Sequence, residues 1–242
     1  MTSSIPPLPV VHRDIVDLYA SRYEVLKPTG FAAWDLALGG ITPGVARILG
    51  PRALELSLAT AAAAPGSADN TLVVGAGRSG RVLAQCARTA GLVEPRFLDT
   101  SEMAQVIEVV RRHEPTYVVL DRLESIRMVP TAIRELDAAC LNVGATLFAC
   151  GTYDSSHAAR IGKSIWSYAV QTVRLISETP GHANGIFELR VTDNPFASPL
   201  ASVSVVRIRV SPAGRIELAA STDEIDPDGP FVLEVREVSP GE

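Results

Sequence analysis

Residues 28–51 read PTGFAAWDLALGGITPGVARILGP, and this stretch decides the fold class. Two turn signals, Gly39-Gly40 and Pro43-Gly44, precede the apolar run ARILG at 46–50, which is typical of a buried strand. The helix-forming run ELSLATAAAA follows at 55–64. A strand that leads directly into a helix is the unit from which parallel sheets with helical cover are built.

The same alternation continues along the chain. The expected strands are 71–74, 96–99, 116–121 and 145–150, and the expected helices are 80–92, 101–114 and 131–144. The strands are almost continuously apolar, which indicates a parallel sheet covered by helices on both faces. Three runs with alternating polarity, 170–177, 185–192 and 201–210, favour an antiparallel extension. We therefore predict a three-layer α/β/α fold with a mostly parallel sheet and an antiparallel extension at the C-terminal end.

Composition places the chain among globular proteins. It has 242 residues, 47% hydrophobic and 20% charged, enough for one large α/β domain. The net charge is −5, and Asp223–Glu242 alone carries −6, from seven acidic residues and one Arg, so the body is close to +1. Such a body neither repels nucleic acid nor forms the basic surface of a dedicated DNA-binding protein. We predict a tail and helix at 1–27, a core at 28–218 and an acidic mobile tail at 219–242.

Several classes of protein are disfavoured. The odd set Cys86, Cys140 and Cys150 contains no CxxC, and the four His are scattered, so we expect no disulfide framework, metal site or bound cofactor. The N-terminal MTSSIPPLPVV lacks the pattern of a signal peptide, and no apolar stretch approaches about 20 residues. We expect a cytoplasmic protein without a membrane partner.

Residues 11–26 place Ile15, Leu18 and Tyr19 near one face of an expected helix. This helix either packs on its own domain or docks onto a partner protein.

The stretch 28–51 resembles the opening of the RecA/KaiC core. It keeps the pattern of that opening at Thr29, Gly30, Asp35, Leu38, Gly39, Gly40, Pro43, Gly44 and Gly50, with Trp34 at a position that is usually Leu. Residues 162–176 and 191–200 resemble bacterial RecA in particular, in the segment after its second DNA-binding loop and in the strand that reaches the neighbouring subunit's nucleotide. The resemblance covers residues 28–218 and implies a RecA-like core.

The phosphate loop of this core is degraded. A working loop reads G-x-x-x-x-G-K-[ST], in which backbone N–H groups and the Lys hold phosphates and the hydroxyl binds Mg²⁺. Gly50 and Pro51 begin that spacing, but Glu55 and Leu56 stand at the Gly and Lys positions, and only Ser57 is kept. A carboxylate would repel phosphate, and Leu56 has no cation to offer.

The other positions that the resemblance assigns to ATP chemistry are altered too. Gly75-Ala76-Gly77 replaces the catalytic Glu, Cys150, Gly151 or Thr152 replaces the sensor Gln, and Asp193 and Pro195 replace the inter-subunit lysines. Asp121 alone matches, at the position that holds Mg²⁺. We therefore expect no catalytic residues, no ATP-driven reaction and no nucleotide-dependent filament.

The sequence Gly-Pro-Arg followed by ELSL, without a Lys, is similar to the ImuA family of small bacterial RecA-like proteins. These proteins accompany a Y-family polymerase relative in damage-induced (SOS) translesion mutagenesis. The resemblance implies a role in DNA repair or recombination, and it implies a RecA-type recombinase, the polymerase relative and single-stranded DNA as partners. For DNA the candidate residues are Arg160 and Lys163, in a loop followed by Trp166 and Tyr168.

Two alternatives remain open. Gly75, Gly77 and Gly80 form a G-x-G-x-x-G turn between an expected strand and helix, and Asp99 follows about 20 residues later. That pattern is the fingerprint of NAD(P)-type dinucleotide binding. A KaiC-like signalling protein is the other alternative, although that family normally keeps the Lys.

Overall fold

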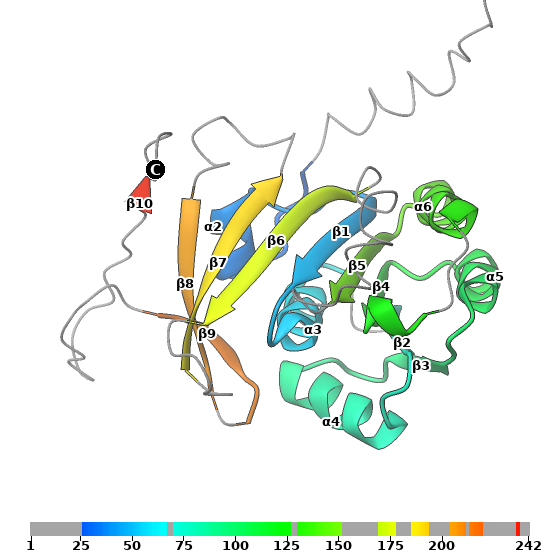
Figure 1. The fold of residues 1–242 in the computed structure, drawn as a ribbon, viewed down its shortest axis with the longest axis horizontal. Coiled ribbons are helices and arrows are strands. Elements are labelled where there is room, and N and C mark those ends of the chain that lie inside the picture. Colours follow the sequence, from blue (N-terminus) through cyan, green and yellow to red (C-terminus); the bar gives the residue numbers. More distant parts are fainter. Residues whose placement is uncertain are drawn as a thin grey trace, which may run out of the picture.

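The computed structural model describes residues 26–66, 70–126, 130–151, 169–177, 185–193, 204–211, 213–219 and 236–237. Figure 1 shows one central sheet with helices packed on both sides of it. The helices are α2 (Ala32–Leu38), α3 (Ala53–Ala63), α4 (Gly80–Ala90), α5 (Met103–His113) and α6 (Pro130–Asn142), with a 3-10 turn η1 (Leu123–Ser125). The strands are β1 (Gly44–Leu49), β2 (Thr71–Gly75), β3 (Arg96–Asp99), β4 (Tyr117–Asp121), β5 (Thr146–Gly151), β6 (Ala169–Ser177), β7 (Gly185–Asp193), β8 (Ser204–Val210), β9 (Ile216–Leu218) and β10 (Arg236–Glu237).

The sheet has the strand order β10-β8-β7-β6-β1-β5-β4-β2-β3, with β9 also paired to β8. All pairs from β3 to β6 are parallel, and the pairs that join β6, β7, β8, β9 and β10 are antiparallel. This arrangement confirms the predicted α/β class with a mostly parallel sheet and a C-terminal antiparallel extension.

Two apolar clusters fill the space between the layers. On one face, α2, α3 and α4 pack against the sheet around Trp34, Leu56 and Phe148. On the other face, α5 and α6 pack around Val106, Leu120 and Leu136. Because helices cover both faces of the parallel strands, β2 and β4 are buried along their whole length, as the apolar runs predict.

Helix α2 and strand β9 were not expected from the sequence. α2 has only seven residues and ends at Gly39, which adopts the left-handed conformation typical of a helix C-cap. Its Trp34 is fully buried, donates from Nε1 to the carbonyl oxygen of Gly40 at 3.1 Å, and packs edge-on against Phe148. These contacts fasten the opening segment to the sheet.

Asp35 gives the Thr-Gly opening its structural role. Its Oδ1 accepts hydrogen bonds from the backbone N–H and the hydroxyl of Thr29, and its Oδ2 accepts one from the N–H of Gly30, each at 2.8 Å. The carboxylate therefore closes the turn that leads into α2.

Parallel strands end at a common edge of the sheet, and that edge carries the candidate site. Gly50 follows β1, Gly75 ends β2, Asp121 ends β4 and Gly151 ends β5. Leu49 pairs with Gly151 and Gly75 pairs with Asp121, so these strand ends are neighbours in the sheet. Crevices at the carboxyl ends of strands are where α/β proteins bind ligands.

In the described part of the chain, none of the helices is both long and apolar enough to span a bilayer. The expected docking helix with Ile15, Leu18 and Tyr19, and most of the tail at 219–242, lie outside the described residues. Arg236 and Glu237 of that tail form β10, which pairs antiparallel with β8.

Candidate functional site

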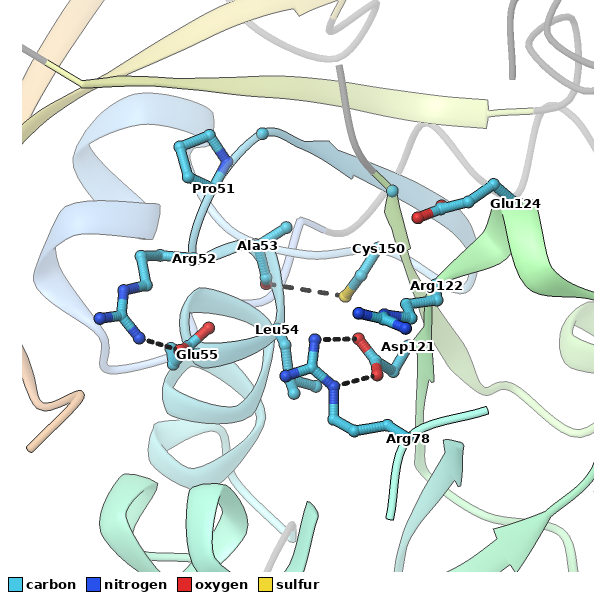
Figure 2. A pocket seen from close by; sticks show the side chains of 12 residues that line it. Pro51, Arg52, Ala53, Leu54, Glu55, Arg78, Asp121, Arg122, Glu124 and Cys150 are labelled. Atoms are coloured by element: carbon cyan, nitrogen blue, oxygen red, sulfur yellow. Dashed lines mark hydrogen bonds and ion pairs between the residues drawn. The ribbon is translucent and has the colours of Figure 1, made fainter. Parts of the chain in front are cut away.

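A pocket of about 150 Å³ opens at the carboxyl ends of β1, β4 and β5 (Figure 2). It lies between the start of α3 and the turn after β2. The residues that line it are Gly50, Pro51, Arg52, Ala53, Leu54, Glu55, Arg78, Asp121, Arg122, Glu124, Cys150 and Gly151. Four of the positions that the sequence assigned to the degraded nucleotide site, Gly50, Pro51, Glu55 and Asp121, therefore line one pocket.

The connection between β1 and α3 is too short to be a phosphate loop. β1 ends at Leu49 and α3 begins at Ala53, so three residues join them, and Pro51 has no N–H to offer. In the working motif the helix follows a longer Gly-rich loop and begins near the Gly-Lys pair. Here Ala53 and Leu54, which would belong to that loop, form the first turn of the helix.

Gly50 makes this tight connection possible. Its φ is +114°, and a methyl group on its Cα would overlap the carbonyl oxygen of Leu175 on β6. Its N–H donates to the carbonyl oxygen of Gly151 at 3.0 Å. Gly50 is therefore required by the close packing of β1, β5 and β6, whether or not a ligand binds.

Glu55 and Arg52 pair with each other at the mouth of the pocket. The guanidinium Nη1 of Arg52 lies 2.5 Å from Oε1 of Glu55, three residues further along the chain. Arg52 itself has a left-handed backbone, with φ of +67°. The pair places a carboxylate at the start of α3, where a nucleotide would place its phosphates.

Leu56 and Ser57 face the interior. Both are fully buried, and Leu56 belongs to the apolar cluster under α3. The hydroxyl of Ser57 donates to the carbonyl oxygen of Ala53 at 2.8 Å and lies 3.0 Å from the Cys150 thiol. Ser57 stands at the hydroxyl position of the phosphate-loop motif. Its hydroxyl is bonded within the protein.

Asp121 is engaged by Arg78. Nε of Arg78 donates to Oδ2 at 2.6 Å and Nη2 to Oδ1 at 3.4 Å, a two-point contact that is visible in Figure 2. The Asp121 side chain is 3% exposed. Burial raises the pKa of the Asp121 carboxyl, and the hydrogen bond and positive charge of Arg78 oppose that rise.

Cys150 forms the floor of the pocket and stays a thiol. It is buried between Ser57 and the Ala53 carbonyl, and burial raises its pKa well above that of an ordinary thiol. Because only the thiolate is an effective nucleophile, this cysteine is chemically inert.

The sequence reasoning missed Arg52, Arg78, Arg122 and Glu124 as pocket residues. Arg78 lies inside the G-x-G-x-x-G turn, and its partner Asp121 is 43 residues away in the sequence. A usable signal existed, because Asp121 ends one of two strands expected to be parallel and Arg78 lies in the turn that follows the other. Arg122 has a left-handed backbone with φ of +55°, a rare conformation for a non-Gly residue.

The Gly-rich turn has the geometry of a strand–turn–helix–strand unit. β2 and β3 are parallel neighbours, and Gly75 at the end of β2 pairs with Asp99 at the end of β3. A methyl group at Gly75 would overlap Leu83 of α4, so that glycine permits close packing of strand and helix. Gly77 has φ of +80°, and Gly80 begins α4.

The structure does not place every predicted site residue. Arg160 and Lys163, with Trp166 and Tyr168, lie outside the described residues, as do Thr152 and Pro195. The DNA-binding loop that they were expected to form stays a prediction.

Comparisons with known proteins leave the family open. No protein-family model matches the chain. A search of curated proteins also finds no match.

Proposed function

We propose that this protein is a RecA-like accessory protein of DNA repair or damage-induced mutagenesis that binds protein partners and does not hydrolyse ATP. One observation carries the proposal. The Ser57 hydroxyl and the Asp121 carboxylate, the two groups that the RecA resemblance assigns to Mg²⁺, are both bonded to other parts of the protein.

Magnesium and nucleotide do not fit the residues present. Mg²⁺ needs oxygen ligands in near-octahedral order, and in this site the guanidinium of Arg78 takes both carboxylate oxygens of Asp121. Phosphoryl transfer depends on a metal ion and a cation to offset the charge that develops on phosphate. In this pocket the start of α3 carries Glu55, which Arg52 already neutralises.

A domain that keeps this architecture but does not hydrolyse ATP is suited to binding protein partners. Two ion pairs, Arg52–Glu55 and Arg78–Asp121, lie in the pocket, so the site contributes to the stability of the sheet edge. The ImuA resemblance supports a RecA-type recombinase or a Y-family polymerase relative as the partner, with single-stranded DNA as a weaker ligand.

Partner binding is the test of this proposal. The full chain is immobilised, and a purified RecA-type recombinase, as a filament on single-stranded DNA, and a purified Y-family polymerase relative are passed over it without nucleotide in the running buffer. We expect saturable binding of at least one of them. Binding of neither would refute the proposed role in repair or mutagenesis.

The predicted docking helix has its own test. A chain that lacks residues 1–26 is compared with the full chain, after circular dichroism and thermal melting have shown that both are folded. Loss of partner binding in the shortened chain would support docking through Ile15, Leu18 and Tyr19. Unchanged binding would place the partner surface elsewhere.

Dinucleotide binding is the second candidate function, and the pairing of Gly75 with Asp99 at the ends of two adjacent parallel strands favours it. In that fingerprint the pyrophosphate lies at the helix N-terminus and the acid holds a ribose. Titration with NADH, followed by its fluorescence, tests this candidate. Saturable binding that Asp99→Asn weakens would support it, and absence of binding at millimolar NADH would exclude it.

A further inference from the structure

The antiparallel extension has one apolar and one basic face. On β6, β7 and β8, alternate residues such as Leu175, Leu189 and Ile208 belong to the cluster under α2. Helix α2, which contacts β7 and β8, lies on that apolar side, behind these strands in Figure 1. Because successive side chains of a strand point to opposite faces, the residues between them lie on the other face.

This other face is rich in arginine, and we call it the arginine face. Its arginines are Arg174 on β6, Arg190 on β7, Arg207 and Arg209 on β8, Arg215 beside β9, and Arg47 at its border on β1. Among the side chains that the structure describes, its acidic residues are Glu188 and Glu217. Counted over the side chains that the structure describes, six arginines and two glutamates give this face a formal charge of about +4, on a chain whose net charge is −5.

The register of the sheet brings some of these like charges close together. Arg174 and Arg190 are direct cross-strand partners, and like charges in that position are destabilising. Arg47 lies close enough to Arg174 for a second effect, because burial together with the charge of Arg174 lowers the pKa of Arg47 to about 9. A polyanion on this face would offset both repulsions.

Several arginines of this face are accessible. The Arg190 side chain is 51% exposed and pairs with Glu188, and Arg215 is 75% exposed and pairs with Glu217. Arg209 is also exposed. Alternate residues along a strand are about 6.6–6.8 Å apart and neighbouring strands about 4.8 Å apart, so the guanidinium groups form a two-dimensional array.

We propose that the arginine face binds the phosphate backbone of nucleic acid, independently of base sequence. Among the described residues of this face the cations are arginines, whose planar fork makes two parallel hydrogen bonds to one phosphate. The described apolar residues on it, among them Ile176 and Ile186, are aliphatic and offer no ring for base stacking. The proposal rests on the part of the proposed function that gives the protein single-stranded DNA as a ligand. It needs no protein partner, so a failure of this face to bind DNA can be told apart from a failure to bind the polymerase relative.

The test measures binding of a fluorescein-labelled 30-mer of deoxythymidylate to the full chain, by anisotropy, at several salt concentrations from about 50 mM. The variant Arg190→Ala/Arg209→Ala is compared with wild type and with Arg111→Ala/Arg112→Ala. That control removes the same charge from two exposed positions on α5.

We expect Arg190→Ala/Arg209→Ala to weaken binding at least about tenfold at low salt. The slope of log K against log salt should decrease by about 1.4, since each phosphate contact with a single strand contributes about 0.7. The control should change Kd less than about twofold. The variant Arg190→Lys/Arg209→Lys should keep the slope and recover part of the affinity.

Three outcomes would overturn the proposal. In the first, the wild type does not bind the oligonucleotide at about 50 mM salt. In the second, Arg111→Ala/Arg112→Ala loses as much affinity as Arg190→Ala/Arg209→Ala. In the third, the slope of log K against log salt is unchanged in Arg190→Ala/Arg209→Ala. Poly-glutamate of matched charge serves as a competitor, and if it binds more tightly than the oligonucleotide, the partner is an acidic protein. If Arg160→Ala/Lys163→Ala alone removes all binding, the loop at 153–163 is the DNA site and the arginine face is not.

Discussion

At the scale of single residues, the pair Arg78–Asp121 decides what the pocket can do. The Asp121 carboxylate is almost completely buried, and burial raises its pKa. Burial alone would lower the pKa of Arg78, but the hydrogen bond and charge of Asp121 raise it overall. Each residue therefore favours the charged form of its partner.

Removing Arg78 should therefore destabilise the fold in a pH-dependent way. We expect Arg78→Ala to lower the free energy of unfolding by about 2 kcal/mol at pH 7, less than for a fully buried pair because Arg78 is 31% exposed. Without Arg78 the folded-state pKa of Asp121 rises further above its unfolded value of about 4. A raised folded-state pKa gives stability that is present at low pH and is lost as the pH rises through it.

The loss in free energy of unfolding caused by Arg78→Ala should thus be smaller at pH 5 than at pH 7, as measured by urea unfolding at both pH values. The double variant Arg78→Ala/Asp121→Asn is the control, because it has no carboxyl to titrate and should show little of this dependence. A deficit in Arg78→Ala that is equal at both pH values would contradict the role assigned to Asp121.

Asp35 is the second residue whose role is structural. It accepts three hydrogen bonds from Thr29 and Gly30. Asp35→Asn replaces one acceptor oxygen by an N–H₂ group that faces these donors, and we expect a loss of about 1–3 kcal/mol in stability. Glu135→Gln, at an exposed position of α6, is the matched control. Its free energy of unfolding in urea should stay within about 0.5 kcal/mol of the wild-type value.

At the scale of elements, the three-residue connection between β1 and α3 is shorter than the phosphate loop of a nucleotide-binding protein. It depends on Gly50, whose backbone has a positive φ and whose Cα faces the Leu175 carbonyl. Helix α3 can begin at Ala53 because no loop has to wrap around phosphate.

Substitution of Gly50 or of Gly80 by Ala should have opposite effects on the stability of the fold. Gly50→Ala forces a methyl group against β6 and should cost at least about 2 kcal/mol in thermal or urea unfolding. Gly80→Ala lies in the first turn of α4, where no other group lies within 4 Å of the new methyl, and should stabilise by up to about 1 kcal/mol. A harmless Gly50→Ala would show that the β1–α3 connection is not as tight as described.

Most elements were predictable because their signals are local. The apolar run TYVVLD and the amphipathic run after Ser101 predict β4 and α5 within two residues at each end. Helix α2 was not predicted, because it has only seven residues and its burial comes from long-range packing of Trp34 on Phe148. The arginine face was not predicted either. The alternation of polar and apolar residues predicts its strands, but cross-strand pairs such as Arg174–Arg190 depend on the register between strands.

At the scale of the whole molecule, a parallel sheet with helices on both faces supports a small pocket at one edge and a basic sheet face on the extension. The resemblance to the RecA core predicts that Gly50, Glu55 and Asp121 belong to one site. It does not show that Arg52 and Arg78 neutralise the two carboxylates, since those pairings depend on side-chain positions in the folded chain.

Calorimetric titration of the full chain with Mg²⁺-ATP tests the central proposal most directly. If Arg78, Glu55 and the buried Ser57 close the site as described, we expect no saturable heat and no Kd tighter than about 1 mM, equivalent to roughly −4 kcal/mol. Saturable binding of one ATP with a micromolar Kd would contradict a closed nucleotide site.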